Sequence, residues 1–151
     1  MSLRNRIPRR RSAGFTLLEV MIATSVSGVL ASVAYPSVSA ALHKARRSEA
    51  LVALTQVQLA QERWRSGSGR YASLAELGLP ATAMGGHYQL AVADPAPQGY
   101  VAIAQATGAQ AGDRQCRYMK LVVDGANLVY SSGETDATTN NATANRQCWN
   151  L

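Results

Sequence analysis

The hydrophobic pattern at the start of the chain is a single long apolar run. Residues 15–34 carry only one charged side chain, Glu19. A helix of that length rises about 30 Å, the thickness of one hydrocarbon core. Arginines precede the run, and positive charges before a span predict that its amino end stays in the cytoplasm. The pattern therefore predicts a membrane-spanning helix beginning near residue 15.

After this run the pattern becomes that of an amphipathic helix with one apolar face. Ala53, Val57, Ala60 and Trp64 recur at spacings of four, three and four residues, as in a helix with 3.6 residues per turn. The run Ser-Gly-Ser-Gly at 66–69 predicts the end of that helix. A continuous helix from about 15 to 66 is expected, and its second half can cover a sheet.

Strand patterns follow after a connection over residues 67–86. Four strands are expected, at 87–93, 100–105, 117–123 and 127–131. Asp124-Gly125 between two apolar runs predicts a hairpin turn, and the short connections predict an antiparallel sheet. The stretch 133–145, without a period, is expected to be a loop. A long helix followed by a four-stranded antiparallel sheet predicts an α+β fold.

The charge distribution weakens the first impression of a basic protein. The chain has 15 Lys/Arg against 9 Asp/Glu, a formal net charge of +6. Five of the arginines lie in the first fourteen residues, which contain no acid. The basic character therefore belongs to the amino-terminal leader, and the remainder is close to neutral.

The two cysteines, Cys116 and Cys148, are expected to form a disulfide, because the chain has the pattern of an exported protein. In the chain-entropy model that bond stabilises the fold by roughly 3–4 kcal/mol. Neither cysteine belongs to a C-x-x-C motif, and His43 and His87 are far apart in the sequence. No metal site and no cofactor are expected.

The sequence contains no pattern of catalytic residues. Gly67 and Gly69 end a helix instead of forming a phosphate-binding loop after a strand. No serine motif marks a strand-to-helix elbow. His43 and His87 are both expected on solvated surfaces, and an enzyme is not expected.

The junction between leader and apolar run resembles a known signal. Residues 11–19, Arg-Ser-Ala-Gly-Phe-Thr-Leu-Leu-Glu, resemble the class III signal of type IV pilins and type II secretion pseudopilins. The resemblance implies that prepilin peptidase cuts between Gly14 and Phe15 and that Phe15 is then methylated. It also makes Glu19 the assembly carboxylate, which can pair with the new α-amine of Phe15 on a neighbouring subunit.

Further positions resemble the same family. Gly28 and Pro36 fall where the family has a helix-loosening glycine and a kink-forming proline. The disulfide-bounded tail and its Cys148-Trp149 ending resemble small PilE-type minor pilins. The resemblance is specific at the amino end and architectural afterwards. The implied organisation is a leader (1–14), a membrane-spanning half-helix (15–36), an amphipathic half-helix (37–66), an αβ loop (67–86) and a sheet with a disulfide-bounded region (87–151).

The resemblance implies a structural subunit of a type IV pilus, a minor pilin, serving motility, adhesion or DNA uptake. It would be a single-pass protein of the bacterial inner membrane, with its amino terminus in the cytoplasm, before joining the extracellular pilus. Its partners would be other pilin subunits, prepilin peptidase and the inner-membrane assembly platform.

Several alternatives stay open. A type II secretion pseudopilin shares the first half of this pattern. In a DNA-binding receptor for natural transformation, the basic cluster Lys44, Arg46 and Arg47 would contact DNA rather than acids on neighbouring subunits or water. An ordinary secretory signal cut after Ser32-Val33-Ala34 and a plain membrane anchor are further alternatives.

Overall fold

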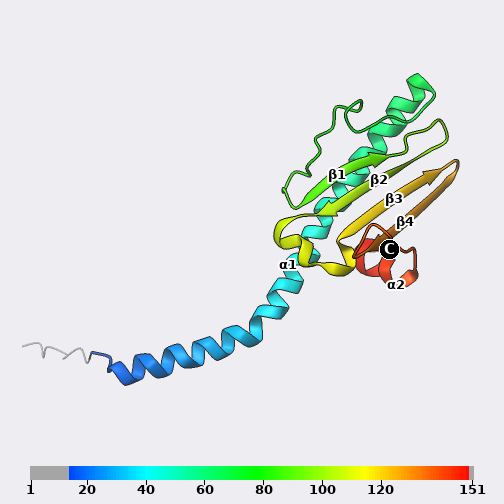
Figure 1. The fold of residues 1–151 in the computed structure, drawn as a ribbon. Helices are drawn as coiled ribbons and strands as arrows, with labels where there is room; N and C mark the ends of the chain where they lie inside the picture. Colours follow the sequence, from blue (N-terminus) through cyan, green and yellow to red (C-terminus); the bar gives the residue numbers. More distant parts are fainter. Residues whose placement is uncertain (1–13, 150–151) are drawn as a thin grey trace, which may run out of the picture. The chain divides into compact units, whose positions relative to one another are not determined.

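A computed structural model describes residues 14–149 of the chain. The predicted basic leader lies outside the described residues, apart from Gly14. The chain divides into two compact units, Met1–Val38 and Ser39–Leu151, which we call the first and second units. Helix α1 (Leu17–Ser68) belongs to both of them (Figure 1).

In the first unit, α1 exposes large apolar side chains on every side. Their exposed fractions lie between 51% and 82%. These residues are Phe15, which precedes the helix, and Leu17, Leu18, Val20, Met21, Ile22, Val26, Val29, Leu30, Val33, Tyr35 and Val38 within it. By length and composition α1 could cross a membrane. Within residues 14–149 this part of the helix has no buried side chain, so its apolar surface requires lipid or other helices.

The hydroxyl groups of this segment bond to the helix that carries them. Thr24 Oγ1 donates to Val20 O at 3.0 Å, and Ser27 Oγ donates to Ala23 O at 2.8 Å. Ser25 bonds in the same way to the preceding turn. These hydroxyls therefore need no outside partner and are compatible with an apolar environment.

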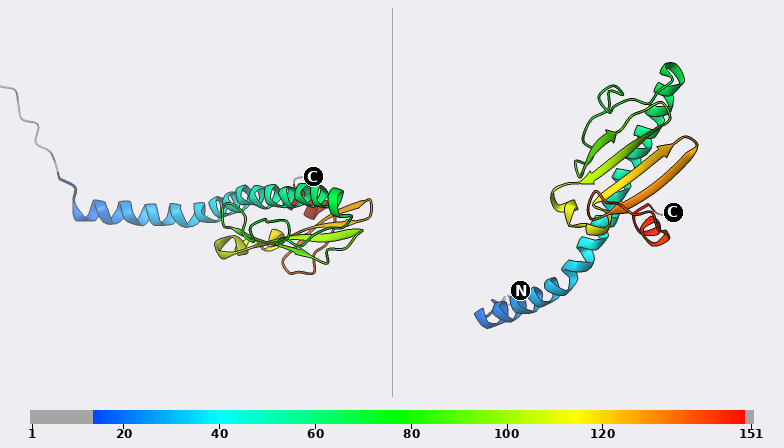
Figure 2. Two further views of the ribbon diagram at one scale, coloured as in Figure 1. Left: turned by 90° about the horizontal axis from the view of Figure 1, so that it is seen from above. Right: turned by 45° about the vertical axis from the view of Figure 1, so that its right-hand side comes forward.

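The second unit is a four-stranded antiparallel sheet covered on one face by α1 (Figure 2). Its strands are β1 (Tyr88–Ala93), β2 (Gly99–Ala106), β3 (Tyr118–Asp124) and β4 (Asn127–Gly133), in spatial order 1-2-3-4. From α1, Ala50, Ala53, Leu54 and Val57 are buried in the core against the sheet. The predicted α+β fold is confirmed.

Two local predictions need correction. β3 includes Asp124, which pairs with Asn127, so the hairpin turn consists of Gly125 and Ala126 rather than Asp124 and Gly125. Gly125 has φ +58°, the conformation required at the first position of a type II′ turn. The expected loop at 133–145 is confirmed over residues 134–141, but Gly133 belongs to β4 and the last part is helical, with α2 (Ala142–Ala144) followed by η3 (Asn145–Trp149).

A buried glutamine holds the connection after α1 in place. Gln61 is completely buried on the core face of α1. Its Nε2 donates to Ala72 O at 2.7 Å, and Ala72 N donates to its Oε1 at 2.8 Å. One side chain thus satisfies both backbone groups of a residue that is itself buried.

We predict that Gln61→Met destabilises the protein by about 2–4 kcal/mol, because the two backbone groups of Ala72 would be left buried and unpaired. Gln56→Met, on the exposed face of the same helix, should change stability by no more than about 0.5 kcal/mol. Denaturant unfolding of the full chain in detergent, followed by tryptophan fluorescence, measures both variants. Equal effects would contradict the role of Gln61.

Candidate functional site

The residues of the expected processing signal lie at the start of α1. Phe15 is 82% exposed, and Glu19 lies in the first turn of the helix. Glu19 N donates to Thr16 Oγ1 at 3.2 Å, and Thr16 N donates to Glu19 Oε2 at 3.4 Å. This reciprocal pair is a capping box. The sequence analysis missed it, although the signature Thr-x-x-Glu was readable at 16–19.

The capping box gives Glu19 a local role beside the expected intersubunit one. One carboxylate oxygen accepts the Thr16 N–H bond, and a carboxylate can accept several hydrogen bonds. Glu19 can therefore help to cap its own helix and still bind a cation from another chain.

The helix continues through both positions that were expected to loosen or kink it. Gly28 and Pro36 lie inside α1. A Cβ placed on Gly28 would meet no atom within 4 Å, so its own chain does not require a glycine there. The roles of Gly28 and Pro36 stay predictions.

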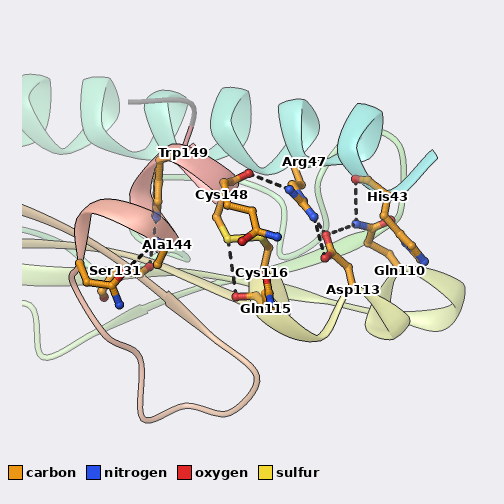
Figure 3. The surroundings of a disulfide bond; sticks show 12 residues. His43, Arg47, Gln110, Asp113, Gln115, Cys116, Ser131, Ala144, Cys148 and Trp149 are labelled. Carbon is orange, nitrogen blue, oxygen red and sulfur yellow. Dashed lines mark hydrogen bonds and ion pairs between the residues drawn. A yellow bond between two sulfur atoms is a disulfide. The ribbon is translucent and has the colours of Figure 1, made fainter. Parts of the chain in front are cut away.

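In the basic cluster of α1, one residue forms an ion pair within the second unit and the other two do not. Arg47 Nε and Nη2 donate to the two carboxylate oxygens of Asp113 at 2.7 and 2.9 Å, and its Nη1 donates to Gln147 O at 2.7 Å (Figure 3). Lys44 and Arg46 have no ion-pair partner among residues 14–149. Only these two members of the cluster are available for another molecule.

A buried glutamine joins this ion pair to the sheet. Gln110 is completely buried, and its Nε2 lies 3.1 Å from the Tyr88 hydroxyl and 3.2 Å from Asp113 Oδ2. Burial raises the pKa of Tyr88 to about 12, against the lowering effect of its bond with Gln110. His43 Nδ1 lies 3.0 Å from Gln110 Oε1. The expectation of a solvated His43 is therefore wrong.

The other histidine also has a partner on α1. His87 Nδ1 lies 2.8 Å from Glu49 Oε2, and the backbone N–H of His87 donates to Glu49 Oε1 at 3.1 Å. The His87 side chain is 34% exposed, which agrees with its expected surface position. Within the part of the chain that the structure describes, no group of three His, Cys, Asp or Glu could hold a metal.

The predicted disulfide joins Cys116 and Cys148, and both residues are buried. The bond connects the 3-10 segment η2 (Arg114–Cys116) to η3. Next to it, Trp149 Nε1 donates to Ser131 O at 3.3 Å (Figure 3). The Trp149 ring also packs on Tyr130. The carboxy-terminal segment is thus attached to β4 as well as to the segment before β3.

We predict that Arg47→Gln and Asp113→Asn each destabilise the second unit by about 3–5 kcal/mol, because each leaves a charged partner buried and unpaired. The double variant should cost about 1–3 kcal/mol less than the sum of the two single variants. Arg46→Gln, next in sequence, serves as the control and should have almost no effect. Additive costs in denaturant unfolding would contradict direct coupling.

Known proteins share parts of this chain. Type II secretion system core protein G of Aeromonas hydrophila is 34% identical over 73 residues, which are 48% of this chain and 50% of that protein. The same protein from Pectobacterium carotovorum is 37% identical over 71 residues, 47% and 45% of the two chains. The type IV major pilin protein PilA of Myxococcus xanthus is 35% identical over 65 residues, 43% and 30%. The chain thus covers half or less of the length of each of these relatives.

Two family models match different parts of the chain. The prokaryotic N-terminal methylation motif matches residues 9–35, which include Gly14, Phe15 and Glu19. The family described as "Type IV minor pilin ComP, DNA uptake sequence receptor" matches residues 36–120. Since that match covers more than half of the chain and the fold agrees with it, the protein belongs to the type IV minor pilin ComP family.

Proposed function

We propose that the protein is a structural subunit of a type IV pilus that assembles through its amino-terminal helix. The observation that carries this proposal is the apolar surface of residues 15–38, whose side chains are exposed along the whole segment. Lipid can cover that surface before assembly, and neighbouring helices can cover it afterwards. Lipid and helix surfaces are about equally apolar, so close packing and polar pairs must drive the exchange.

The polar pair that we propose is formed by two chains. Cleavage between Gly14 and Phe15 by prepilin peptidase creates a new α-amine, and methylation of Phe15 keeps its positive charge. In an apolar helix bundle a carboxylate requires such a partner. Glu19 of one subunit therefore pairs with the Phe15 amine of a neighbour and sets the register of assembly. Gly28 and Pro36 give the helix freedom to adapt to its neighbours.

The proposed location and partners follow from that mechanism. The precursor is a single-pass protein of the bacterial inner membrane with its amino terminus in the cytoplasm. The inner-membrane assembly platform transfers it into an extracellular filament with other pilin subunits. The ComP family match favours a minor pilin, while the similarity to type II secretion core protein G keeps a pseudopilin as the alternative. Loss of pili rather than loss of protein secretion in a deletion strain distinguishes the two.

We predict that the mature protein begins at Phe15, carries one added methyl group and lacks the two hydrogens lost to the disulfide. Intact-mass measurement with and without prepilin peptidase checks this. Glu19→Gln should be processed normally yet be absent from sheared filaments. Thr16→Ala removes the hydroxyl of the capping box and retains the carboxylate, so it should still enter filaments.

This pair of variants separates the two roles of Glu19. Loss of filament incorporation in both would make helix capping the important role. Normal incorporation of Glu19→Gln would disprove the proposed pairing. A mature chain that begins at Tyr35 would mean a secretory signal and would overturn the filament proposal itself.

We propose DNA binding as a second function of the same subunit. The matched family is described as a DNA uptake sequence receptor, and the second unit has exposed cations that can meet phosphates. Lys44, Arg63 and Arg146 are exposed and, like Arg46, have no partner among the described residues. Residues 39–151 carry ten Lys/Arg and eight Asp/Glu. Such a small excess favours local contacts over general attraction to DNA.

We predict that the purified full chain in detergent binds a fluorescein-labelled DNA duplex and releases it as salt rises. The logarithm of the binding constant should fall with the logarithm of salt concentration by about 0.9 per phosphate contacted. Fluorescence anisotropy at several salt concentrations measures that slope. If Lys44 and Arg46 each contact one phosphate, replacing both by Gln should make the slope less steep by about 0.9 for each of the two lost contacts. Absent or salt-insensitive binding would exclude this function.

A further inference from the structure

The face of the sheet that is turned away from α1 (Figure 2) carries a row of polar side chains across three strands. Gln89 of β1 lies directly opposite Gln105 of β2, and Gln105 lies opposite Tyr118 of β3. The next residues along β1 and β3, Leu90 and Met119, are buried on the core face. Since side chains alternate along a strand, Gln89, Gln105 and Tyr118 share the outer face. We call these three residues the polar row.

A hollow of about 310 Å³ lies beside the polar row on this outer face. All three residues of the row line it, and Ala91 and Ile103 add apolar surface. These two residues are paired across β1 and β2, in the position next to the Gln89–Gln105 pair on the same face. Small-molecule sites begin at about 300 Å³ and combine apolar surface with a few convergent polar groups. The hollow has that composition and that size.

The hydrogen-bonding groups of the polar row are unused within the fold. Their side chains form no hydrogen bond with any residue between 14 and 149. Gln61 and Gln110 differ, because both ends of their amides are bonded inside the second unit. Each amide offers donors and an acceptor, and the phenol offers one of each. Directly opposite residues have Cβ atoms only about 4.5–5.5 Å apart, so one small molecule can reach several of these groups.

The charge at the hollow is balanced. Among the described lining residues only Asp136 is charged, and its Oδ1 lies 2.7 Å from Lys120 Nζ. Lys120 Nζ also donates to Asp136 O at 2.8 Å. The Asp136 side chain is 74% exposed, so its second carboxylate oxygen can still accept a hydrogen bond. The lining thus offers polar groups to a ligand without an unpaired charge that would favour an ion.

We propose that the hollow on the outer face of the sheet binds a neutral sugar. Each sugar hydroxyl both donates and accepts a hydrogen bond, as do the amides and the phenol of the polar row. The C–H groups of a sugar ring carry a small positive charge, which suits the negative face of an aromatic ring such as that of Tyr118. The proposal goes beyond filament assembly and DNA binding and depends on neither, because it uses no residue of 15–38 and neither Lys44 nor Arg46.

Saturation-transfer NMR on the full chain tests the proposal. The detergent must be zwitterionic, because a sugar headgroup would compete for the site. The probes are the methyl glycosides of glucose, galactose, mannose and N-acetylglucosamine, and N-acetylneuraminic acid is the anionic comparison. At least one neutral glycoside should bind with a Kd on the order of 1 mM, since a few neutral hydrogen bonds at an exposed site bind weakly. Raising the salt concentration about tenfold should not change that Kd, because salt screens charges.

Two variants and a matched control locate the site. Gln105 is the centre of the polar row, so Gln105→Ala should raise the Kd about tenfold through the loss of two hydrogen bonds. Tyr118→Phe keeps the ring and removes only the hydroxyl, and it should raise the Kd about three- to fivefold. Gln98 is exposed in the connection between β1 and β2 and does not line the hollow. Gln98→Ala should therefore keep the wild-type Kd.

Three results would overturn the proposal. The first is a folded wild-type chain that transfers no saturation to any of the four neutral glycosides. The second is an unchanged Kd in Gln105→Ala, which would place the sugar elsewhere. The third is binding of N-acetylneuraminic acid alone, weakened by salt, which would make charge the basis of recognition. Tryptophan fluorescence of each variant shows whether the second unit is folded, since Trp64 and Trp149 both belong to it.

Discussion

The interaction on which the second unit most depends is the contact between Arg47 and Asp113. The Arg47 side chain is 13% exposed and the Asp113 side chain 6%, so neither charge is fully solvated. Such a pair is stable only if the remaining polar atoms are also bonded. Gln110 supplies a donor to Asp113, and Gln147 O accepts from Arg47. One guanidinium thus connects α1 to the segment before β3 and to the carboxy-terminal segment.

The disulfide and this ion pair restrain the same surface in different ways. Linking Cys116 to Cys148 limits how far η3 can move from η2, which mainly restricts the unfolded chain. It does not set the distance of either segment from α1. The bonds from Arg47 do that, and Trp149 on Tyr130 adds an apolar contact with the sheet. Together these contacts attach the carboxy-terminal segment to η2, to α1 and to the sheet.

Periodicity in the sequence was sufficient for the architecture because helices and strands are local patterns. The stripe at Ala53 and Val57 predicted the buried face of α1, and alternation predicted four strands within two residues of their ends. The bonds of Arg47 and His43 could not be predicted, because their partners lie 66 and 67 residues away in a segment without a period. An isolated charged or amide residue has no sequence pattern that indicates its partner, so only the folded structure shows which of these side chains meet.

The two halves of α1 have different structural roles, so substitutions in them should have different effects. Every buried residue of α1 lies between Ala50 and Gln61, so the fold of the second unit uses no side chain of residues 15–38. That segment is free to be apolar on all sides, and Glu19 can be placed for a partner chain without cost to the sheet. Substitutions there should change assembly and leave the stability of the second unit unaltered. Conversely, Arg47 and Gln61 stabilise the fold of the second unit. Their substitution should affect a filament only indirectly, by changing the surface that the second unit presents.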